Sequence, residues 1–469
     1  MAVIDHVIVF GDSLSDIGRK WSQPMGMVAS CIPEDGLRML AVSATGRFSD
    51  SKNWTDYMFE ATAGQDLIST SREATILASG EYHRLSSRWV HPPGGSRFRY
   101  ANYAVGGAVG WKASAITKKI GLTTFSDQVD EFEEDFAAVS RAGTQKIHTF
   151  LFIVMFGAND IYTDEKDSNV SKNIGNGIIK QCNRLEKILK GHGPSPAMVV
   201  AGVGYPSQSI FYTSQLESLK TRERAEINGL RQALAARPGL SEFLPSEYEV
   251  SQPRKNYERK VAGLHGQVAT LNTCLRQHCE LAAPNRHYFS MRESLLALHE
   301  DAPALGIDVT KHQTVAQFEK ISHKKDNIHY HNADNPALRT PQGQLPLFTA
   351  DQKHPTSHAY RYLWTRMHGL LSDKGLQFGL LSPPALAPLV IKNRVWQKDS
   401  EVHTCHKCHT KFGVFTRKHH CRECGRIFCD NCTKNRVTLD QPLIENGQDK
   451  RQGVKDCRVC DDCYRQLVS

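Results

Sequence analysis

The sequence predicts an α/β domain with a parallel sheet, followed by a small module stabilised by metal ions. The first prediction rests on apolar strand-like segments that alternate with amphipathic helical segments from residue 1 to about residue 377. The second rests on eight cysteines in four Cys-x-x-Cys pairs after residue 404. A chain of 469 residues is also too long for one ordinary core, which favours two domains.

Three segments are predicted to be buried parallel strands, at residues 7–10, 148–156 and 197–203. Residues 128–141 and 174–190 carry apolar side chains at helical spacing and are predicted to be core-facing helices. Hydrophobic residues make up 40% and charged residues 23% of the chain, which excludes a largely disordered protein. No apolar run is long enough to span a bilayer, so we expect no transmembrane segment.

Polar stretches interrupt this pattern at residues 70–100, 213–257 and 302–345, and each is longer than an ordinary connection. We expect them to be surface insertions, some of which could form a lid. Residues 380–389 hold three prolines, which stiffen the chain and favour a domain boundary. The predicted organisation is a first domain over residues 1–377, a linker over 378–395 and a second module over 396–469.

We expect no signal peptide, because the first ten residues lack a basic leader and a small-residue cleavage site. A reducing compartment follows from that expectation. Nine of the thirteen cysteines fall between Cys405 and Cys463, which suits zinc thiolates better than a disulfide framework. Of the others (Cys31, Cys182, Cys274 and Cys279), Cys274 and Cys279 could pair if the protein were exported.

The first candidate site follows the first strand directly. The string Phe-Gly-Asp-Ser-Leu-Ser-Asp at residues 10–16 puts Ser13 in a small polar turn at the carboxyl edge of the sheet. Open α/β sheets bind their ligands at this edge. Alone the string is weak, because Asp12 or Ser13 could merely cap the next helix.

Three further strings change that assessment: residues 102–108 (Asn-Tyr-Ala-Val-Gly-Gly-Ala), 156–160 (Phe-Gly-Ala-Asn-Asp) and 351–356 (Asp-Gln-Lys-His-Pro-Thr). With residues 46–50 (Gly-Arg-Phe-Ser-Asp) and Trp54, they resemble the SGNH or GDSL family of lipases and esterases across residues 1–377. The resemblance implies a three-layer α/β/α domain with a flavodoxin-like parallel sheet.

Acyl transfer needs a nucleophile, a base, a group that orients the base and donors for the oxyanion. The resemblance assigns the first three roles to Ser13, His354 and Asp351. It implies no cofactor for catalysis. The oxyanion donors that it implies are the backbone N–H of Ser13, the backbone N–H of Gly107, with Gly106 as the neighbouring candidate, and the side-chain amide of Asn159.

Each of these residues alone also has a structural explanation, as a turn, a strand exit or a solvent-facing histidine. Asp12 and Asp160 are expected to be structural and to hold the neighbouring loops. The strings at residues 46–49, 102–108 and 125–129 look most like the lipolytic branch with glycerophospholipid–cholesterol acyltransferases and bacterial phospholipases A. The expected activity is therefore that of a phospholipase A, a lysophospholipase or an acyltransferase.

The second candidate site is the cysteine-rich tail. Two ligands three residues apart grip one tetrahedral zinc, so four such pairs supply two closed four-thiolate sites. Residues 391–469 contain 16 Lys or Arg and 10 Asp or Glu, a surplus of +6 within a net charge of +9. Ubiquitin transfer, nucleic-acid binding and acidic-lipid binding are all open for such a module.

Three strings between the cysteines narrow this choice: residues 396–399 (Trp-Gln-Lys-Asp), 417–422 (Arg-Lys-His-His-Cys-Arg) and 458–460 (Arg-Val-Cys). They resemble the FYVE domain signature over residues 391–469. By that pattern one zinc takes Cys405, Cys408, Cys429 and Cys432, and the other takes Cys421, Cys424, Cys460 and Cys463. Cys457 is left over and is not an expected ligand.

The ligand of the FYVE family is phosphatidylinositol 3-phosphate, whose ring phosphate needs several convergent donors. The implied lipid-binding residues are Asp399, Arg417, Lys418, His419, His420, Arg422 and Arg458. Val414 and Phe415 are expected at an exposed apolar loop tip that enters the headgroup region, with Phe412 in the core.

Together the two resemblances imply two structural Zn²⁺ ions and a lipid-acting serine ester hydrolase on membranes that contain phosphatidylinositol 3-phosphate. The expected location is cytoplasmic and peripheral on early endosomal or phagosomal membranes, in a host cell if the protein is a bacterial effector. The alternatives are an inactive phosphoinositide-binding scaffold and an esterase of a non-lipid ester. No nucleic-acid partner is expected, because the tail lacks the ligand-and-helix pattern of a groove-reading finger.

Overall fold

The structure is a computed structural model of the chain. It describes residues 2–20, 46–63, 89–90, 99–112, 123–141, 149–163, 169–237, 239, 244–282, 284–314, 317, 344–378, 396–413, 416–439, 443–444, 447–448, 454–461 and 463–464. Contacts divide the chain into two compact units. The larger comprises residues 1–300, 309–331 and 346–383, and the smaller comprises residues 384–469 with 301–308 and 332–345. Residues 379–395 lie outside the described residues, so the linker stays a prediction.

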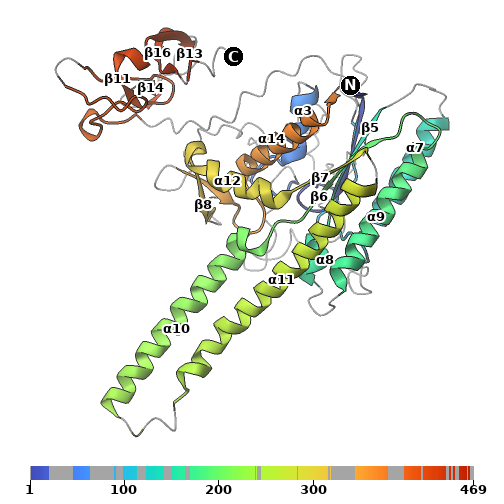
Figure 1. The fold of residues 1–469 in the computed structure, drawn as a ribbon, viewed down its shortest axis with the longest axis horizontal. Helices are drawn as coiled ribbons and strands as arrows, with labels where there is room; N and C mark the ends of the chain where they lie inside the picture. Colours follow the sequence, from blue (N-terminus) through green and yellow to red (C-terminus); the bar gives the residue numbers. More distant parts are fainter. Residues whose placement is uncertain are drawn as a thin grey trace, which may run out of the picture. The chain divides into compact units, whose positions relative to one another are not determined.

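A six-stranded sheet forms the centre of the larger unit (Figure 1). Its strand order is β3 (Trp89–Val90), β4 (Arg99–Asn102), β2 (His6–Gly11), β5 (Phe150–Met155), β6 (Ala197–Ala201) and β7 (Arg286–Phe289). All neighbours run parallel except β3, which is antiparallel to β4. The predicted α/β domain with a parallel sheet is confirmed, with the antiparallel strand β3 as the exception. The three predicted strands correspond to β2, β5 and β6.

Helices cover both faces of this sheet (Figure 1). One face packs against α7 (Phe125–Arg141), α9 (Val170–Leu189) and α11 (Glu247–Ala282), and the other lies beside α3 (Trp54–Ala63) and α14 (Ser357–Asp373). Because side chains alternate along a strand, Ile8 and Phe10 join the core with α7. The two predicted helices correspond to α7 and α9, and the short α8 (Ala158–Thr163) follows β5.

A long helical hairpin occupies the polar stretch at residues 213–257. It consists of α10 (Ile210–Ala236) and α11, which lie side by side (Figure 1). Along α10 only Ile210 is buried, and the ion pairs Arg254–Glu223 at 2.5 Å and Arg231–Glu247 at 2.7 Å join the two helices. The expected surface insertion is thus helical, and its action as a lid stays a prediction. No helix among the described residues is long and apolar enough to cross a bilayer.

The remaining described elements before the tail are shorter than the helices of the hairpin. The other two polar stretches lie mostly outside the described residues. β1 (Ala2–Ile4) pairs in parallel with β10 (Leu376–Phe378). The other described elements are the 3-10 helix η2 (Pro206–Gln208), α12 (Met291–Leu305), and the paired strands β8 (Ile307–His312) and β9 (Leu345–Phe348).

The tail consists of very short elements around cysteines. They are η6 (Asp399–Glu401), β11 (His419–His420), β12 (Ile427–Phe428), η7 (Asp430–Cys432), β13 (Asn435–Leu439), β14 (Leu443–Ile444), β15 (Gly447–Gln448) and β16 (Val454–Val459). β11 pairs with β12, β13 with β16 and β14 with β15, each antiparallel. Its buried cluster consists mostly of cysteines, together with Phe428, Leu439 and Val459. So small an apolar core depends on metal for its stability.

Candidate active site and zinc module

Ser13 lies in the turn that directly follows β2, and a buried glutamine fixes the start of that turn. Gln128 Oε1 accepts a hydrogen bond from the N–H of Gly11 at 3.0 Å, and Gln128 Nε2 donates to the carbonyl of Gly11 at 2.8 Å. The N–H of Leu14 donates to Asp12 Oδ1 at 3.1 Å. Hydrogen bonds therefore fix the backbone on both sides of Ser13, from Gln128 at Gly11 and from Asp12 at Leu14.

Asp16 ties this turn to the loop that follows β4. Its Oδ2 accepts from the N–H of Gly106 at 2.6 Å, and its Oδ1 accepts from the N–H groups of Gly18 and Arg19 at 2.8 and 2.7 Å. Burial raises the pKa of Asp16, and these backbone donors oppose the rise. Asn102 adds a bond from its amide to the carbonyl of Ser15 at 2.9 Å. Sequence reasoning assigned no such role to Asp16 or Gln128, although both fall in strings that carried the family resemblance.

His354 stands between Ser13 and Asp351 in a hydrogen-bonded row. Its Nε2 lies 2.8 Å from Ser13 Oγ, and its Nδ1 lies 2.5 Å from Asp351 Oδ2. Asp351 and His354 belong to the turn between β9 and α14. His354 is 341 residues away from Ser13 in the sequence. The ring of Phe48 packs 5.1 Å from the imidazole, between centroids. The structure thus brings together the three residues predicted to form the triad.

Asp351 is a buried carboxylate with several donors. Its Oδ1 accepts from Thr349 Oγ1 and from the N–H groups of Lys353 and His354, each at 2.9 Å. Burial alone would raise the pKa of Asp351, but the attraction of His354 and the bonds from His354 and Lys353 outweigh it and lower that pKa to about 2. Asp351 is therefore ionised at neutral pH, as a partner that orients a histidine must be.

The predicted oxyanion donors lie on the loops around Ser13. Gly107 has φ +81°, a conformation that favours glycine. The amide of Asn159, at the start of α8, donates to the carbonyl of Ala108 at 3.0 Å and so links α8 to the loop after β4. The N–H of Gly106 is bound to Asp16, whereas no described residue accepts from the N–H of Gly107 or of Ser13. Gly107 rather than Gly106 therefore has a donor to offer.

Asp12 and Asp160 are buried carboxyl groups beside this site. Burial raises the pKa of Asp12 to about 7, against the opposing effects of the Leu14 N–H and of His354. Burial likewise raises the pKa of Asp160 to about 6, although the N–H groups of Gly110 and Trp111 donate to it at 2.7 and 3.1 Å. These contacts agree with the expectation that both residues hold neighbouring loops.

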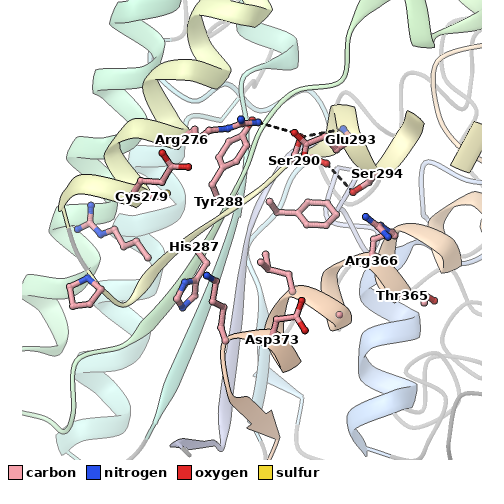
Figure 2. Close-up of a pocket in the computed structure, with 17 residues that line it drawn as sticks. Arg276, Cys279, His287, Tyr288, Ser290, Glu293, Ser294, Thr365, Arg366 and Asp373 are labelled. Carbon is pink, nitrogen blue, oxygen red and sulfur yellow. Dashed lines mark hydrogen bonds and ion pairs between the residues drawn. The ribbon is translucent and has the colours of Figure 1, made fainter. Parts of the chain in front are cut away.

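One described cavity beside the sheet lies apart from the triad. A cavity of about 920 Å³ lies beside the edge strand β7 and α14 (Figure 2), and its lining includes none of the triad residues. In it Arg276 donates to Glu293 at 3.2 Å and lies 5.0 Å from the ring centroid of Tyr288. Because charges of both signs line it, we assign this cavity no role in binding an acyl chain.

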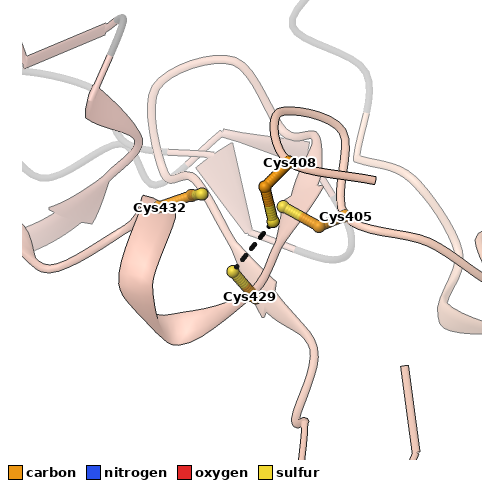
Figure 3. Close-up of side chains that lie close together, drawn as sticks. All are labelled: Cys405, Cys408, Cys429 and Cys432. Atoms are coloured by element: carbon orange, nitrogen blue, oxygen red, sulfur yellow. Dashed lines mark hydrogen bonds between the residues drawn. The ribbon is translucent and has the colours of Figure 1, made fainter. Parts of the chain in front are cut away.

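The eight predicted zinc ligands form two groups of four. One group is Cys405, Cys408, Cys429 and Cys432 (Figure 3), and the other is Cys421, Cys424, Cys460 and Cys463. Within each group the Sγ atoms lie within 4.8 Å of one another. Four soft thiolates gathered so closely fit one tetrahedral Zn²⁺. The predicted pairing of two zinc sites is confirmed, and Cys457 stays outside both, with its Sγ 3.2 Å from the carbonyl of Val454.

The described cysteines of the larger unit are all free in this structure. Cys274 and Cys279 both lie on α11, and both are free in this structure. Five residues along a helix turn two side chains toward different faces, so this pair does not form the bridge that export would have allowed. Cys182 is free and buried, and Cys31 lies outside the described residues.

Two of the predicted lipid-binding residues gather around Trp396. The ring of His420 stacks on the indole with centroids 3.8 Å apart and an angle of 6°, and the guanidinium of Arg422 lies 4.6 Å from the indole centroid. His420 Nε2 is also 3.7 Å from Asp399 Oδ1, and Lys418 donates to the carbonyl of Asp399. Trp396 therefore holds His420 and Arg422 close together, a grouping that the sequence alone did not indicate.

A second group of these residues surrounds Asp430, which sequence reasoning did not single out. Arg458 Nη1 donates to Asp430 Oδ1 at 2.7 Å, and His419 Nε2 lies 3.8 Å from the same oxygen. Arg417 is exposed just before β11. Phe412 packs against the cysteine cluster as expected. The predicted insertion residues Val414 and Phe415 lie outside the described residues.

Comparisons with known proteins identify both parts of the chain. The family described as GDSL-like Lipase/Acylhydrolase matches residues 7–366, and the family described as FYVE zinc finger matches residues 395–469. Arrestin domain-containing protein A of Dictyostelium discoideum is 39% identical over 84 residues, which are 18% of this chain and 13% of that protein. The 1-phosphatidylinositol-3-phosphate 5-kinase FAB1B of Arabidopsis thaliana is 33% identical over 79 residues, 17% of this chain and 4% of the kinase.

Among solved structures, the LM5-1 FYVE domain from Leishmania major is 30% identical in sequence. The match covers 16% of this chain and 81% of the Leishmania chain, with a TM-score of 0.13. The chain spans a small fraction of the length of the curated relatives named above, so each likeness concerns one part only. The family match over residues 7–366, in contrast, extends over most of the chain. The chain therefore belongs to the GDSL-like lipase/acylhydrolase family, and it carries a FYVE zinc finger with two zinc sites at residues 395–469.

Proposed function

We propose that the larger unit is a serine ester hydrolase that acts on membrane lipids. The observation that carries the proposal is the row Asp351–His354–Ser13, with contacts of 2.5 and 2.8 Å. His354 takes the proton of Ser13 Oγ while that oxygen attacks the ester carbonyl, and it then gives the proton to the leaving alcohol. Water, activated by the same histidine, releases the acid. Asp351 stays ionised, holds the imidazole and stabilises its protonated form.

Donors on two loops and on α8 stabilise the negative charge that develops on the carbonyl oxygen. The N–H groups of Ser13 and Gly107 are the backbone donors, and the bond from Asn159 to Ala108 orients the third donor group. Such fixed donors are worth about 10²–10³-fold each in rate in related chemistry. The loops that carry them are held by Asp16, Gln128 and Asp160, which supports a preformed rather than an induced site.

The substrate class we propose is a glycerophospholipid or lysophospholipid, cleaved as by a phospholipase A or lysophospholipase. Transfer to an alcohol is the same reaction with an alcohol in place of the water. Membership in a lipase and acylhydrolase family supports a lipid ester. A zinc finger of the FYVE type on the same chain supports a membrane as the place where that ester is found.

We propose that the tail binds phosphatidylinositol 3-phosphate through Arg417, Lys418, His419, His420, Arg422 and Arg458, with Asp399 accepting from inositol hydroxyls. The stacking of His420 and Arg422 near Trp396 supports a set of convergent donors. Binding would hold the hydrolase peripherally on early endosomal or phagosomal membranes, in a host cell if the protein is a bacterial effector. Confinement to a surface raises the effective concentration of lipid substrate.

The test compares the full chain with Ser13→Ala on phosphatidylcholine vesicles with and without phosphatidylinositol 3-phosphate, read out by lipid analysis. Ser126→Ala, a half-exposed serine on α7, is the matched control. We expect Ser13→Ala to abolish release of fatty acid and the 3-phosphate lipid to increase the rate for the wild-type protein. Unchanged turnover in Ser13→Ala would refute the catalytic role of Ser13, and no turnover by the wild-type protein would leave the inactive scaffold as the explanation. Hydrolysis of soluble esters alone would indicate a non-lipid esterase.

A further inference from the structure

We propose that Gln352 is a positioning residue that supports the catalytic turn on helix α10. This inference rests on the proposed function, because it concerns the alignment of His354 with Ser13. It goes beyond that function by naming a residue outside the triad, and a helix outside the sheet, on which the alignment depends.

The backbone of Gln352 is held in a conformation that it does not prefer. Gln352 has φ +62°, in the left-handed region that favours glycine, between Asp351 and His354. A residue with a side chain persists there when its surroundings compensate for the strain. Its N–H donates to the carbonyl of Thr349 at 3.0 Å, which closes the turn from within. The carbonyl oxygen and the side-chain Oε1 of Gln352 are bound from outside the turn.

Those outside partners all come from the start of α10. The carbonyl of Gln352 accepts from the N–H of Phe211 and from Ser209 Oγ, both at 3.2 Å. The side-chain Oε1 accepts from Ser214 Oγ at 2.9 Å. Three bonds therefore fasten one residue of the catalytic turn to a single helix.

The next residue adds a fourth contact to the same helix. Lys353 Nζ lies 4.4 Å from the ring centroid of Phe211, a cation–π distance. Both residues between Asp351 and His354 are thus anchored on α10. Because the imidazole follows immediately, a shift of this turn changes the 2.8 Å contact between His354 Nε2 and Ser13 Oγ. Misplacement of a catalytic group by about 1 Å costs about 100-fold in rate.

The test uses the full chain and four variants: Gln352→Ala, Gln352→Gly, Ser214→Ala and the double variant Gln352→Ala/Ser214→Ala. The matched control is Thr213→Ala, since the neighbouring Thr213 hydroxyl donates to the carbonyls of Ser209 and Ile210, within its own helical turn. One readout is the rate of labelling of Ser13 by a fluorophosphonate probe, which requires no lipid binding. The other is kcat and KM on a short soluble p-nitrophenyl ester, with thermal unfolding recorded for each variant.

We expect Gln352→Ala to label about 10- to 100-fold more slowly, with a matching fall in kcat and KM within about twofold of wild type. Gln352→Gly should recover part of the loss, because glycine adopts this φ freely and keeps the carbonyl bonds. Ser214→Ala should be slower than Thr213→Ala, and its effect should not add to that of Gln352→Ala.

Labelling of both Gln352→Ala and Ser214→Ala within twofold of Thr213→Ala would overturn the inference while leaving the proposed function intact. Full turnover in Ser13→Ala, in contrast, would remove the proposed function itself. If Gln352→Ala does not fold, the comparison of Ser214→Ala with Thr213→Ala decides alone, because it removes one half-buried hydroxyl. A change in KM without a change in kcat would assign Gln352 to substrate binding and also overturn the positioning role.

Discussion

Asp12 is a buried carboxyl group directly beside Ser13. It is 2% exposed, and burial raises its pKa from 3.8 to about 7. Because the folded-state pKa lies above the unfolded value, the folded protein holds this proton more tightly. The resulting stability is fully present below about pH 3.8 and is lost as the pH rises through about 7.

We therefore expect Asp12→Asn to be more stable than wild type at pH 8 and similar to it at pH 4. Asparagine carries no charge and can still accept the N–H of Leu14 at Oδ1. The gain at pH 8 has an upper limit of about 4 kcal/mol, at 1.36 kcal/mol for each unit of pKa. Urea unfolding at both pH values measures it, with the exposed Asp373→Asn as control. An equal difference at the two pH values would contradict the assignment.

Asp430 is an acidic residue within the proposed lipid site, and its carboxylate occupies one of the basic side chains there. Its carboxylate is 60% exposed and pairs with Arg458 at 2.7 Å, so a ring phosphate must compete with it for that guanidinium. Asp430→Asn should bind phosphatidylinositol 3-phosphate about two- to fivefold more tightly, the range expected for an exposed ion pair. Vesicle titration of the full chain measures this change.

The control for that titration is Asp456→Asn. Asp456 is an exposed carboxylate 3.8 Å from Arg436, which is not one of the predicted lipid-binding residues. Its removal changes the net charge by the same amount. Equal gains for the two variants would mean that overall charge, and not release of Arg458, governs the affinity.

At the scale of elements, α7 supports the site through one side chain. Gln128 is 1% exposed and binds both backbone groups of Gly11 at the end of β2. Gln128→Leu keeps the volume but leaves buried polar groups without this partner, so we expect a loss of about 2–5 kcal/mol in the free energy of unfolding. Urea unfolding measures the loss, with Glu134→Ala on the exposed face of α7 as control. A loss no larger than that of the control would show that water replaces the glutamine.

The elements that sequence reasoning predicted and those it missed differ in what stabilises them. The strands β2, β5 and β6 and the helices α7 and α9 show their burial directly in their apolar pattern. The helix α10 has a single buried residue, and ion pairs such as Arg254–Glu223 join it to α11, so it has no apolar stripe to detect. Residues 213–257 accordingly looked like a polar insertion.

The candidate site divides in the same way. Ser13, His354 and the cysteine pairs stand in local strings whose spacing is set by chemistry, so they were predictable. Gln352 and Asp430 act through partners distant in sequence, on α10 and on β16. Such contacts exist only after folding, and no string of neighbouring residues encodes them.

At the scale of the whole molecule, the two parts of the chain are stabilised by different forces. The larger unit has a sheet core closed by helices on both faces, whereas the tail has a cluster made mostly of cysteines. Metal binding supplies folding free energy to modules of the second kind. Lys and Arg exceed Asp and Glu by 6 over residues 391–469, but eight thiolates with two Zn²⁺ ions offset about 4 of these charges. Contact with an anionic bilayer therefore requires basic side chains that gather on one face.

Removal of zinc from the full chain should therefore affect membrane binding and ester hydrolysis differently. A high-affinity chelator should abolish binding to vesicles that contain phosphatidylinositol 3-phosphate, while hydrolysis of a soluble ester stays within about twofold, because the triad contacts lie within the larger unit. Vesicle co-sedimentation and ester hydrolysis measure the two effects, and added Zn²⁺ should restore binding.

Cys424→Ser should reproduce the loss of vesicle binding, whereas Cys457→Ser, outside both zinc sites, should not. A parallel loss of soluble-ester hydrolysis on chelation would mean that the hydrolase depends on the zinc module for its own fold.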